Sequence, residues 1–231
     1  MRRVRLSKEA VYIIGIALLS FAVAMISCTG FGVSMIVAPA YIVSQKLSFL
    51  TFGQAECVVQ GAWLIVFCAV MRRFSFKYLF SFVTGLFYGA VLDLWRLVIP
   101  HFNPAVTAVG SLPLLLRILY FTLGMVLTSF SVALLFQTYF YPQVYDFFVK
   151  YVSRKLKLPR HRFKLIFDNF NLVLAVALTL ILFHSIVGVG PGTVIMAVLN
   201  GFIIGAFTKL FDKHFIFYSH FPRLESFFDI S

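Results

Sequence analysis

The sequence predicts an all-α membrane protein, a bundle of about six transmembrane helices. Hydrophobic residues make up 61% of the chain and charged residues only 12%, and the mean hydropathy is +0.96. A soluble domain carries roughly 25% charged residues. Apolar runs of roughly 20 residues, the length that crosses the hydrocarbon core of a bilayer, recur along the chain. We therefore expect lipid to surround most of the chain.

The apolar runs give the order of the expected spans. They are Ala10–Cys28, Phe52–Val70, Phe74–Pro100, Leu112–Phe136, Phe167–Val187 and Pro191–Phe211. The first run follows basic residues but is longer than the apolar core of a usual signal peptide, so we expect an uncleaved signal anchor.

Two shorter segments do not fit the list of spans. Tyr141–Lys155 begins with Pro142 and has apolar and charged residues on opposite sides, as expected of a helix lying in the membrane interface. Phe31–Leu47 contains Pro39 and is more apolar. It either re-enters the membrane among other helices or crosses it, which would give seven spans.

The basic residues predict the orientation, because Lys and Arg in short loops stay on the cytoplasmic side. With the N-terminus inside, the six-span order places 17 of the 20 Lys and Arg residues on the cytoplasmic side. The exceptions are Lys46, Arg96 and Arg117. Both ends of the chain are therefore expected in the cytoplasm, and the localisation expected is the cytoplasmic (inner) membrane of a bacterium.

An internal repeat is suggested by two Gly-x-x-x-Gly pairs. Gly85 and Gly89 lie in the third span, and Gly201 and Gly205 lie in the sixth, with an offset of 116 residues in both cases. The expected units are a first three-span repeat (1–111), a second (112–213) and an aromatic cytoplasmic tail (214–231). A three-span unit enters the membrane from opposite sides in its two copies, so we expect an inverted 3+3 repeat. Close helix packing is the simpler explanation of each glycine pair.

Ionisable side chains inside apolar segments are the first candidates for binding a substrate or an ion. Glu56 and Gln60 share one face of the second span, and Asp93 lies one turn after Gly89. The alternatives are that Glu56 lies at the level of the lipid headgroups and that Asp93 forms an ion pair with Arg96 in the same helix.

Two further acids belong to the second half. Asp146 lies in the interface segment, and Asp168 is expected to open the fifth span, four residues after Lys164. A carboxylate at a helix N-terminus is stabilised by the helix dipole, so capping and pairing with Lys164 is the alternative to a binding role for Asp168.

The turn before the last span is rich in glycine and contains Gly188, Gly190, Gly192 and Thr193. Free amides at the start of a helix can bind an anion or a substrate carboxylate. The alternative is a tight reversal between two spans.

Other site classes are not indicated. Cys28, Cys57 and Cys68 lie in apolar stretches without metal-ligand spacing, and no catalytic triad or His-Glu-x-x-His motif is present. We therefore expect no enzyme, no metal and no cofactor. The net charge of +12 comes from basic residues in the short loops between apolar segments, where membrane topology explains them, so no nucleic-acid partner is expected.

The sequence resembles the bacterial YczE/YyaS/YitT family of membrane proteins. The resemblance is carried by Gly30-Phe31-Gly32 with Pro39, by Pro142 with Asp146 and Asp168, and by the glycine turn leading to Gly201 and Gly205. It implies a bacterial multi-pass membrane protein and does not imply a substrate.

The leading hypothesis is a small secondary transporter of a small solute, with an anion among the options. The rival is a non-transporting membrane partner that uses the basic loop and the tail His214–Phe228 as docking surfaces. The partners expected are the lipid bilayer and a small-molecule substrate, and a homodimer is left open.

Overall fold

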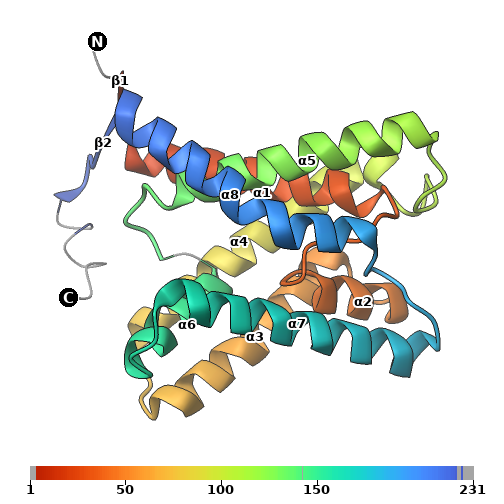
Figure 1. Cartoon of the computed structure of the whole chain (residues 1–231), viewed down its shortest axis with the longest axis horizontal. Helices are drawn as coiled ribbons and strands as arrows, with labels where there is room; N and C mark the ends of the chain where they lie inside the picture. The colour runs from red at the N-terminus through yellow and green to blue at the C-terminus, as the bar shows by residue number, and fades with distance from the viewer. Residues whose placement is uncertain (1–3, 142, 223–224, 226–231) are drawn as a thin grey trace.

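The chain forms a bundle of roughly aligned helices with one pair of short strands at one end (Figure 1). The computed structural model describes residues 4–141, 143–222 and 225. Within these residues the elements are β1 (Val4–Ser7), α1 (Lys8–Ser27), α2 (Ala38–Lys46), α3 (Phe52–Met71), α4 (Phe76–Val98), the 3-10 turn η1 (Pro100–Phe102), α5 (Leu114–Leu135), α6 (Val144–Lys155), α7 (Arg160–Phe183), α8 (Pro191–His214) and β2 (Phe215–Tyr218).

Six of the helices are long and apolar enough to cross a membrane, by length and composition, within the residues described. They are α1, α3, α4, α5, α7 and α8, in the predicted order. The segment Phe31–Leu47 forms only the nine-residue helix α2. Nine residues rise about 14 Å, less than half of the hydrocarbon core, so α2 does not cross and a seventh helical span is not formed.

The largest boundary difference is at α7, which begins at Arg160 and not at the predicted Phe167. Pro159 directly precedes the helix, where a residue without an amide hydrogen costs no helical hydrogen bond. The first turns of α7 are basic, so an apolar pattern could not reveal them. Asp168 therefore lies inside the helix, and the expectation that it caps the N-terminus is wrong.

The long helices pack in two groups. Helix α1 packs along α5 and α4, and α8 packs on α5. Helices α2 and α6 each contact both α3 and α7, and α3 packs along α4. Figure 1 shows α2 and α6 at opposite ends of the bundle, with the strands at the α6 end.

The two strands were not predicted. Strand β1 pairs with β2 in parallel, with Val4 opposite Phe215 and Ser7 opposite Tyr218. Glu9 lies beside this pair and accepts hydrogen bonds from the Tyr139 hydroxyl (3.0 Å) and the Ser219 hydroxyl (3.1 Å). The beginning of the predicted tail is therefore packed against the N-terminal segment. The rest of the tail lies largely outside the described residues.

Helices α3 and α4 approach each other closely at glycine. A Cβ added to Gly89 of α4 would lie 2.6 Å from the carbonyl oxygen of Gly53 and 2.9 Å from Sγ of Cys57, both on α3. A Cβ added to Gly85 would lie 2.2 Å from Oε1 of Gln60. By contrast, a Cβ added to Gly201 or Gly205 of α8 would have no neighbour within 4 Å among the described atoms. Close packing therefore explains the first glycine pair and not the second.

This difference predicts opposite effects of alanine at corresponding positions. Gly89→Ala should lower the free energy of unfolding by about 1–3 kcal/mol, because the new methyl group meets the backbone of α3. Gly201→Ala should leave it unchanged or raise it by up to about 1 kcal/mol through helix propensity. Thermal unfolding of the two variants in detergent measures both effects, and equal midpoints would contradict the packing described.

Candidate functional site

The strongest candidate site is a buried polar cluster where α3 meets α6. The Thr51 side chain and Gln54 form a capping box that fixes the start of α3. From this start, Phe52, Glu56 and Gln60 recur at four-residue spacing on the inner face of the helix. Glu56 and Gln60 are both 0% exposed, so both side chains are enclosed by protein.

The carboxyl group of Glu56 has only one of its oxygens engaged. Oε2 accepts a hydrogen bond from the Tyr145 hydroxyl of α6 (3.0 Å) and a longer one from Nε2 of Gln60 (3.3 Å). Oε1 is buried and has no hydrogen-bond partner among the described residues. Burial raises the pKa of Tyr145 well above its ordinary value, so this hydroxyl keeps its proton and acts as a donor.

Gln60 connects the cluster to the start of α6. Its Nε2 donates to Oε1 of Gln143 (3.4 Å), and its Oε1 accepts from the backbone amide of Val144 (3.4 Å). Nε2 of Gln143 is buried without an acceptor in the described part of the chain. Pro142, predicted to begin this segment, lies outside the described residues.

These contacts leave the cluster short of partners. No Lys, Arg or His side chain lies within ion-pair distance of Glu56 among the described residues, whose ion pairs all involve other groups. An isolated carboxylate in a dry interior is costly, by several kcal/mol after relaxation, unless it binds a proton or a cation. The unengaged Oε1 is the atom at which either could bind.

Gln143 and Tyr145 are not among the site residues predicted from the sequence. Both lie at the start of a segment whose apolar and charged sides suggest contact with lipid, and Tyr145 belongs to the apolar side. A polar residue directly after a proline and before an apolar run was the available signal, but nothing in the sequence indicated that α6 contacts α3.

Asp93 has a structural role that differs from the expected ion pair. Its Oδ1 accepts the amide hydrogen of Gly53 (2.8 Å), and its Oδ2 accepts a hydrogen bond from the Thr51 hydroxyl. Asp93 thus ties α4 to the first turn of α3, where a carboxylate is favoured by the helix dipole. No ion pair joins it to Arg96 in the described part of the protein.

Asp146 and Asp168 share one lysine at the junction of α6 and α7. Nζ of Lys164 lies 3.8 Å from Oδ1 of Asp146 and 3.5 Å from Oδ1 of Asp168. The pairing of Asp168 with Lys164 is confirmed. These partly exposed groups form an ordinary charge cluster, and neither acid is hydrogen-bonded to Glu56.

The glycine turn is joined to the turn that follows α1. The amide of Gly192 donates to the Phe31 carbonyl (2.9 Å), the amide of Val33 donates to the Gly188 carbonyl (3.1 Å), and the Thr193 hydroxyl donates to the Val33 carbonyl (2.7 Å). The amide of Gly190 donates to the Thr193 hydroxyl (3.2 Å). The amides of Gly190 and Gly192 are therefore occupied and not free to bind an anion.

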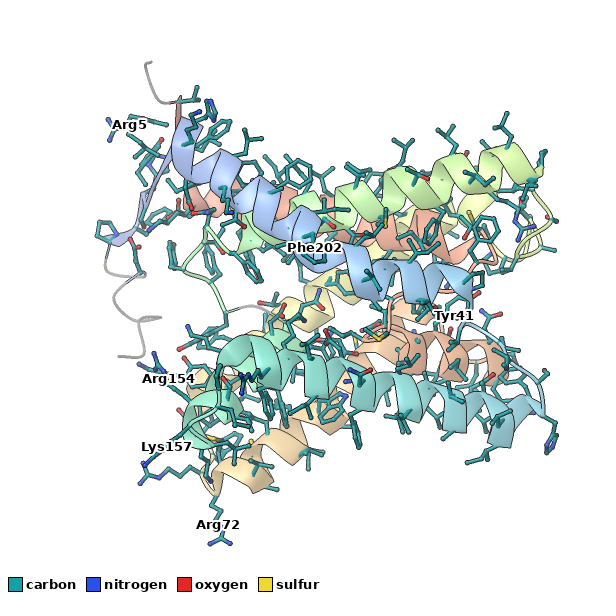
Figure 2. All side chains as sticks on the ribbon, viewed as in Figure 1. Arg5, Tyr41, Arg72, Arg154, Lys157 and Phe202 are labelled. Carbon is teal, nitrogen blue, oxygen red and sulfur yellow. The ribbon has the colours of Figure 1, made fainter. Side chains whose placement is uncertain are left out.

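Beside these two turns lies a pocket of about 280 Å³. It is lined by Ser27, Gly30, Gly32, Val33, Tyr41, Gln45, Val109, Ile186, Val187, Gly188 and Val189. Figure 2 shows Tyr41 at the end of the bundle opposite Arg5, Arg72 and Arg154. Among the described residues, the predicted site residues thus form separate groups by their contacts: Glu56 with Gln60, the two acids around Lys164, the capping Asp93, and the glycine turn with its pocket.

Comparison with known proteins agrees with the resemblance found in the sequence. The model of a family of unknown function, DUF6198, matches residues 6–209. The chain is also 26% identical over 210 residues to the "Uncharacterized protein YyaS" of Bacillus subtilis (strain 168), which covers 90% of this chain and 96% of that protein. No solved structure matches. Because the family model matches most of its length, this chain belongs to the DUF6198 family. Its expected relationship to YyaS is confirmed.

Proposed function

We propose that this chain is a small secondary transporter of the bacterial cytoplasmic membrane, in which Glu56 carries the coupling proton or cation. The observation that supports this proposal most directly is the carboxyl group of Glu56, fully buried in a span with one oxygen unengaged. Ionisable residues inside membrane spans are costly and commonly mark ion pathways. The flanking donors, Tyr145 and Gln60, would hold the carboxyl group in place while its ligand exchanges.

The packing of the helices supports an inverted repeat of two halves, 1–111 and 112–213. If α1–α4 correspond in order to α5–α8, then the contact of α1 with α4 has its counterpart in that of α5 with α8. The contacts of α2 with α3 and α7 correspond to those of α6 with α7 and α3. The two short helices lie at opposite ends of the bundle, as an inverted repeat requires (Figure 1).

The contacts of α4 with α3 and α6 depart from this correspondence. Helix α4 packs closely on α3 through Gly89, whereas α8 makes no comparable contact with α7 among the described residues. In transporters built from inverted repeats, one half rocks against the other around the substrate site. We propose that this difference between the halves belongs to one state of the transport cycle. In the opposite state, Gly201 and Gly205 of α8 would pack closely against α7.

The rival function is a non-transporting membrane partner. It has less support, because Phe215 and Phe217 of the supposed docking tail pack with Phe211 in the described structure. Co-purification of one stoichiometric partner, lost on removal of the tail, would favour the rival over transport.

Neutralising Glu56 should abolish coupling and preserve the fold. A pH-sensitive dye inside liposomes would report proton flux. With the wild-type protein, one class of solute from a panel of small carboxylates, amines and sugars should produce this flux when added. Glu56→Gln should reduce this flux at least about tenfold, because its amide binds no proton at neutral pH. Its thermal midpoint should be equal or higher, since a buried ionisable group is removed.

Asp212→Asn is a matched control, because Asp212 is an exposed acid on α8 that accepts a hydrogen bond from Gln137. It should transport like the wild type. A wild-type protein that moves no solute of the panel would refute the transporter, and normal flux in Glu56→Gln would refute the role of Glu56.

The proposed closure of α8 predicts a transport defect without a folding defect. Gly201→Leu should leave the thermal midpoint unchanged, because the residue is exposed with no near neighbour in the described structure. It should slow transport at least about tenfold, because the leucine would block the close approach of α8 to α7. Val198→Leu, at another exposed position of α8, is the control. Normal transport by Gly201→Leu would rule out this closure.

The proposed orientation can be tested by labelling. In a cysteine-free background, Phe49→Cys, in the turn between α2 and α3, should react with a membrane-impermeant maleimide in intact spheroplasts. Phe74→Cys, in the turn between α3 and α4, should react only after lysis, because the basic turn beside it is retained in the cytoplasm. Both wild-type phenylalanines are exposed. The reverse pattern would show that the chain is inserted the other way.

A further inference from the structure

Arg96 on α4 is a buried basic residue for which the described part of the chain supplies no hydrogen-bond partner. Its side chain is only 9% exposed, and Nε is buried with no acceptor in the described structure. No hydrogen bond or ion pair of its guanidinium is found among the described residues. The guanidinium carbon lies 5.3 Å from the centroid of the Phe52 ring, which is a cation–π contact. An arginine so placed lacks the acceptors that usually offset its loss of water.

The nearest acid does not supply them. Asp93, one turn earlier on α4, is close enough to interact electrostatically with Arg96, but its two oxygens are used by Gly53 and Thr51. The interaction falls beyond ion-pair distance. The positive charge of Arg96 is therefore not neutralised by Asp93. It lies in a region of low dielectric constant, where charges interact over several ångströms.

Phe52 and Tyr41 connect Arg96 with the pocket described above. Arg96 contacts the Phe52 ring, and the Tyr41 ring packs on the same Phe52 with ring centroids 5.2 Å apart. The same tyrosine lines the pocket. Its hydroxyl donates only a long hydrogen bond, 3.4 Å, to the Ser27 carbonyl. Burial raises the pKa of Tyr41, which keeps this hydroxyl a donor.

A second arginine flanks the same pocket. Nη2 of Arg117 would lie 3.3 Å from a Cβ added to Gly30, which lines the pocket. Arg117 donates from Nε to the Thr29 carbonyl and stacks on Phe31, 4.5 Å from the ring centroid. Arg96, Arg117 and Lys46 are the three basic residues that the orientation rule places on the wrong side of the membrane. Lys46 donates to the Leu182 carbonyl (2.7 Å), and a binding role at this end would account for the presence of Arg96 and Arg117.

The walls of the pocket define the ligand further. They contain no acidic side chain. Val33, Val109, Ile186, Val187 and Val189 provide apolar surface, and polar atoms make up about as much of the lining. A volume of about 280 Å³ suits a small molecule. The complementary ligand has one negative group and a compact apolar body.

We propose that this pocket binds a small carboxylate with an apolar body, using the Tyr41 hydroxyl as donor and Arg96 as the buried opposite charge. The carboxylate replaces the Ser27 carbonyl as the acceptor of the tyrosine hydroxyl. As a statement about the transported substrate the inference rests on the proposed function, whereas as a binding site it stands without it.

The test measures binding to the full-length protein in detergent, without transport. Isovalerate and benzoate should raise the thermal midpoint progressively with concentration, and the neutral isovaleramide and benzamide should not. Arg96→Met should lose this response while the ligand-free protein keeps an equal or higher midpoint, because an uncompensated buried charge is removed. Tyr41→Phe should weaken binding about ten- to hundredfold.

Lys46→Gln is the matched control for charge at the same end, because the Lys46 ammonium group already donates to the Leu182 carbonyl. It should keep the full response. The proposal is overturned if the amides act like the acids, if Arg96→Met or Tyr41→Phe responds like the wild type, or if phosphate or chloride raises the midpoint as strongly as the carboxylates. If Arg96→Met does not fold, Arg96→Lys and Tyr41→Phe decide between these outcomes.

The outcomes separate this inference from the proposed function. Carboxylate binding without any transport would keep the pocket and refute the transporter. Transport that depends on Glu56 but moves only neutral or cationic solutes would keep the transporter and refute the carboxylate pocket.

Discussion

The close contact between α3 and α4 at Gly53 and Gly89 is the constraint on which the candidate site depends. With no side chain at either position, the two backbones meet, and Asp93 binds the first turn of α3 at the same level. This contact fixes the rotation of α3 about its axis. Because Glu56 lies one turn beyond Gly53, the same rotation turns its carboxyl group toward α6 and away from lipid.

Two buried ionisable groups of opposite sign follow from this arrangement and do not meet. Glu56 has an unengaged oxygen beside α6, and Arg96 has unengaged donors near Tyr41. Direct pairing would offset the cost of burying both charges. In the proposed mechanism, Glu56 would bind a proton or cation and Arg96 would attract an anion. A transporter that moved a carboxylate together with a proton would carry no net charge across the membrane and would use both.

Much of the fold was predictable because lipid imposes a simple rule on sequence. A span must be apolar over roughly 20 residues, so hydropathy alone located the six long helices. The rule fails where a helix begins with basic residues, as α7 does at Arg160. It also gave no sign of β1 and β2, because four-residue strands at opposite ends of the chain acquire their pairing only when α1 and α8 bring them together.

The sequence by itself determined the apolar helices, the family and the short list of acids from which Glu56 came, because each of these depends on residue type and local spacing. Only the tertiary structure decided which acid is enclosed by protein, which one caps another helix and which one is paired with a lysine. Asp93, Asp168 and Glu56 look alike in an apolar run, but Thr51, Lys164 and Tyr145 reach them from other turns or other helices. The partners of a buried charge, and not its position in a span, set what it can bind.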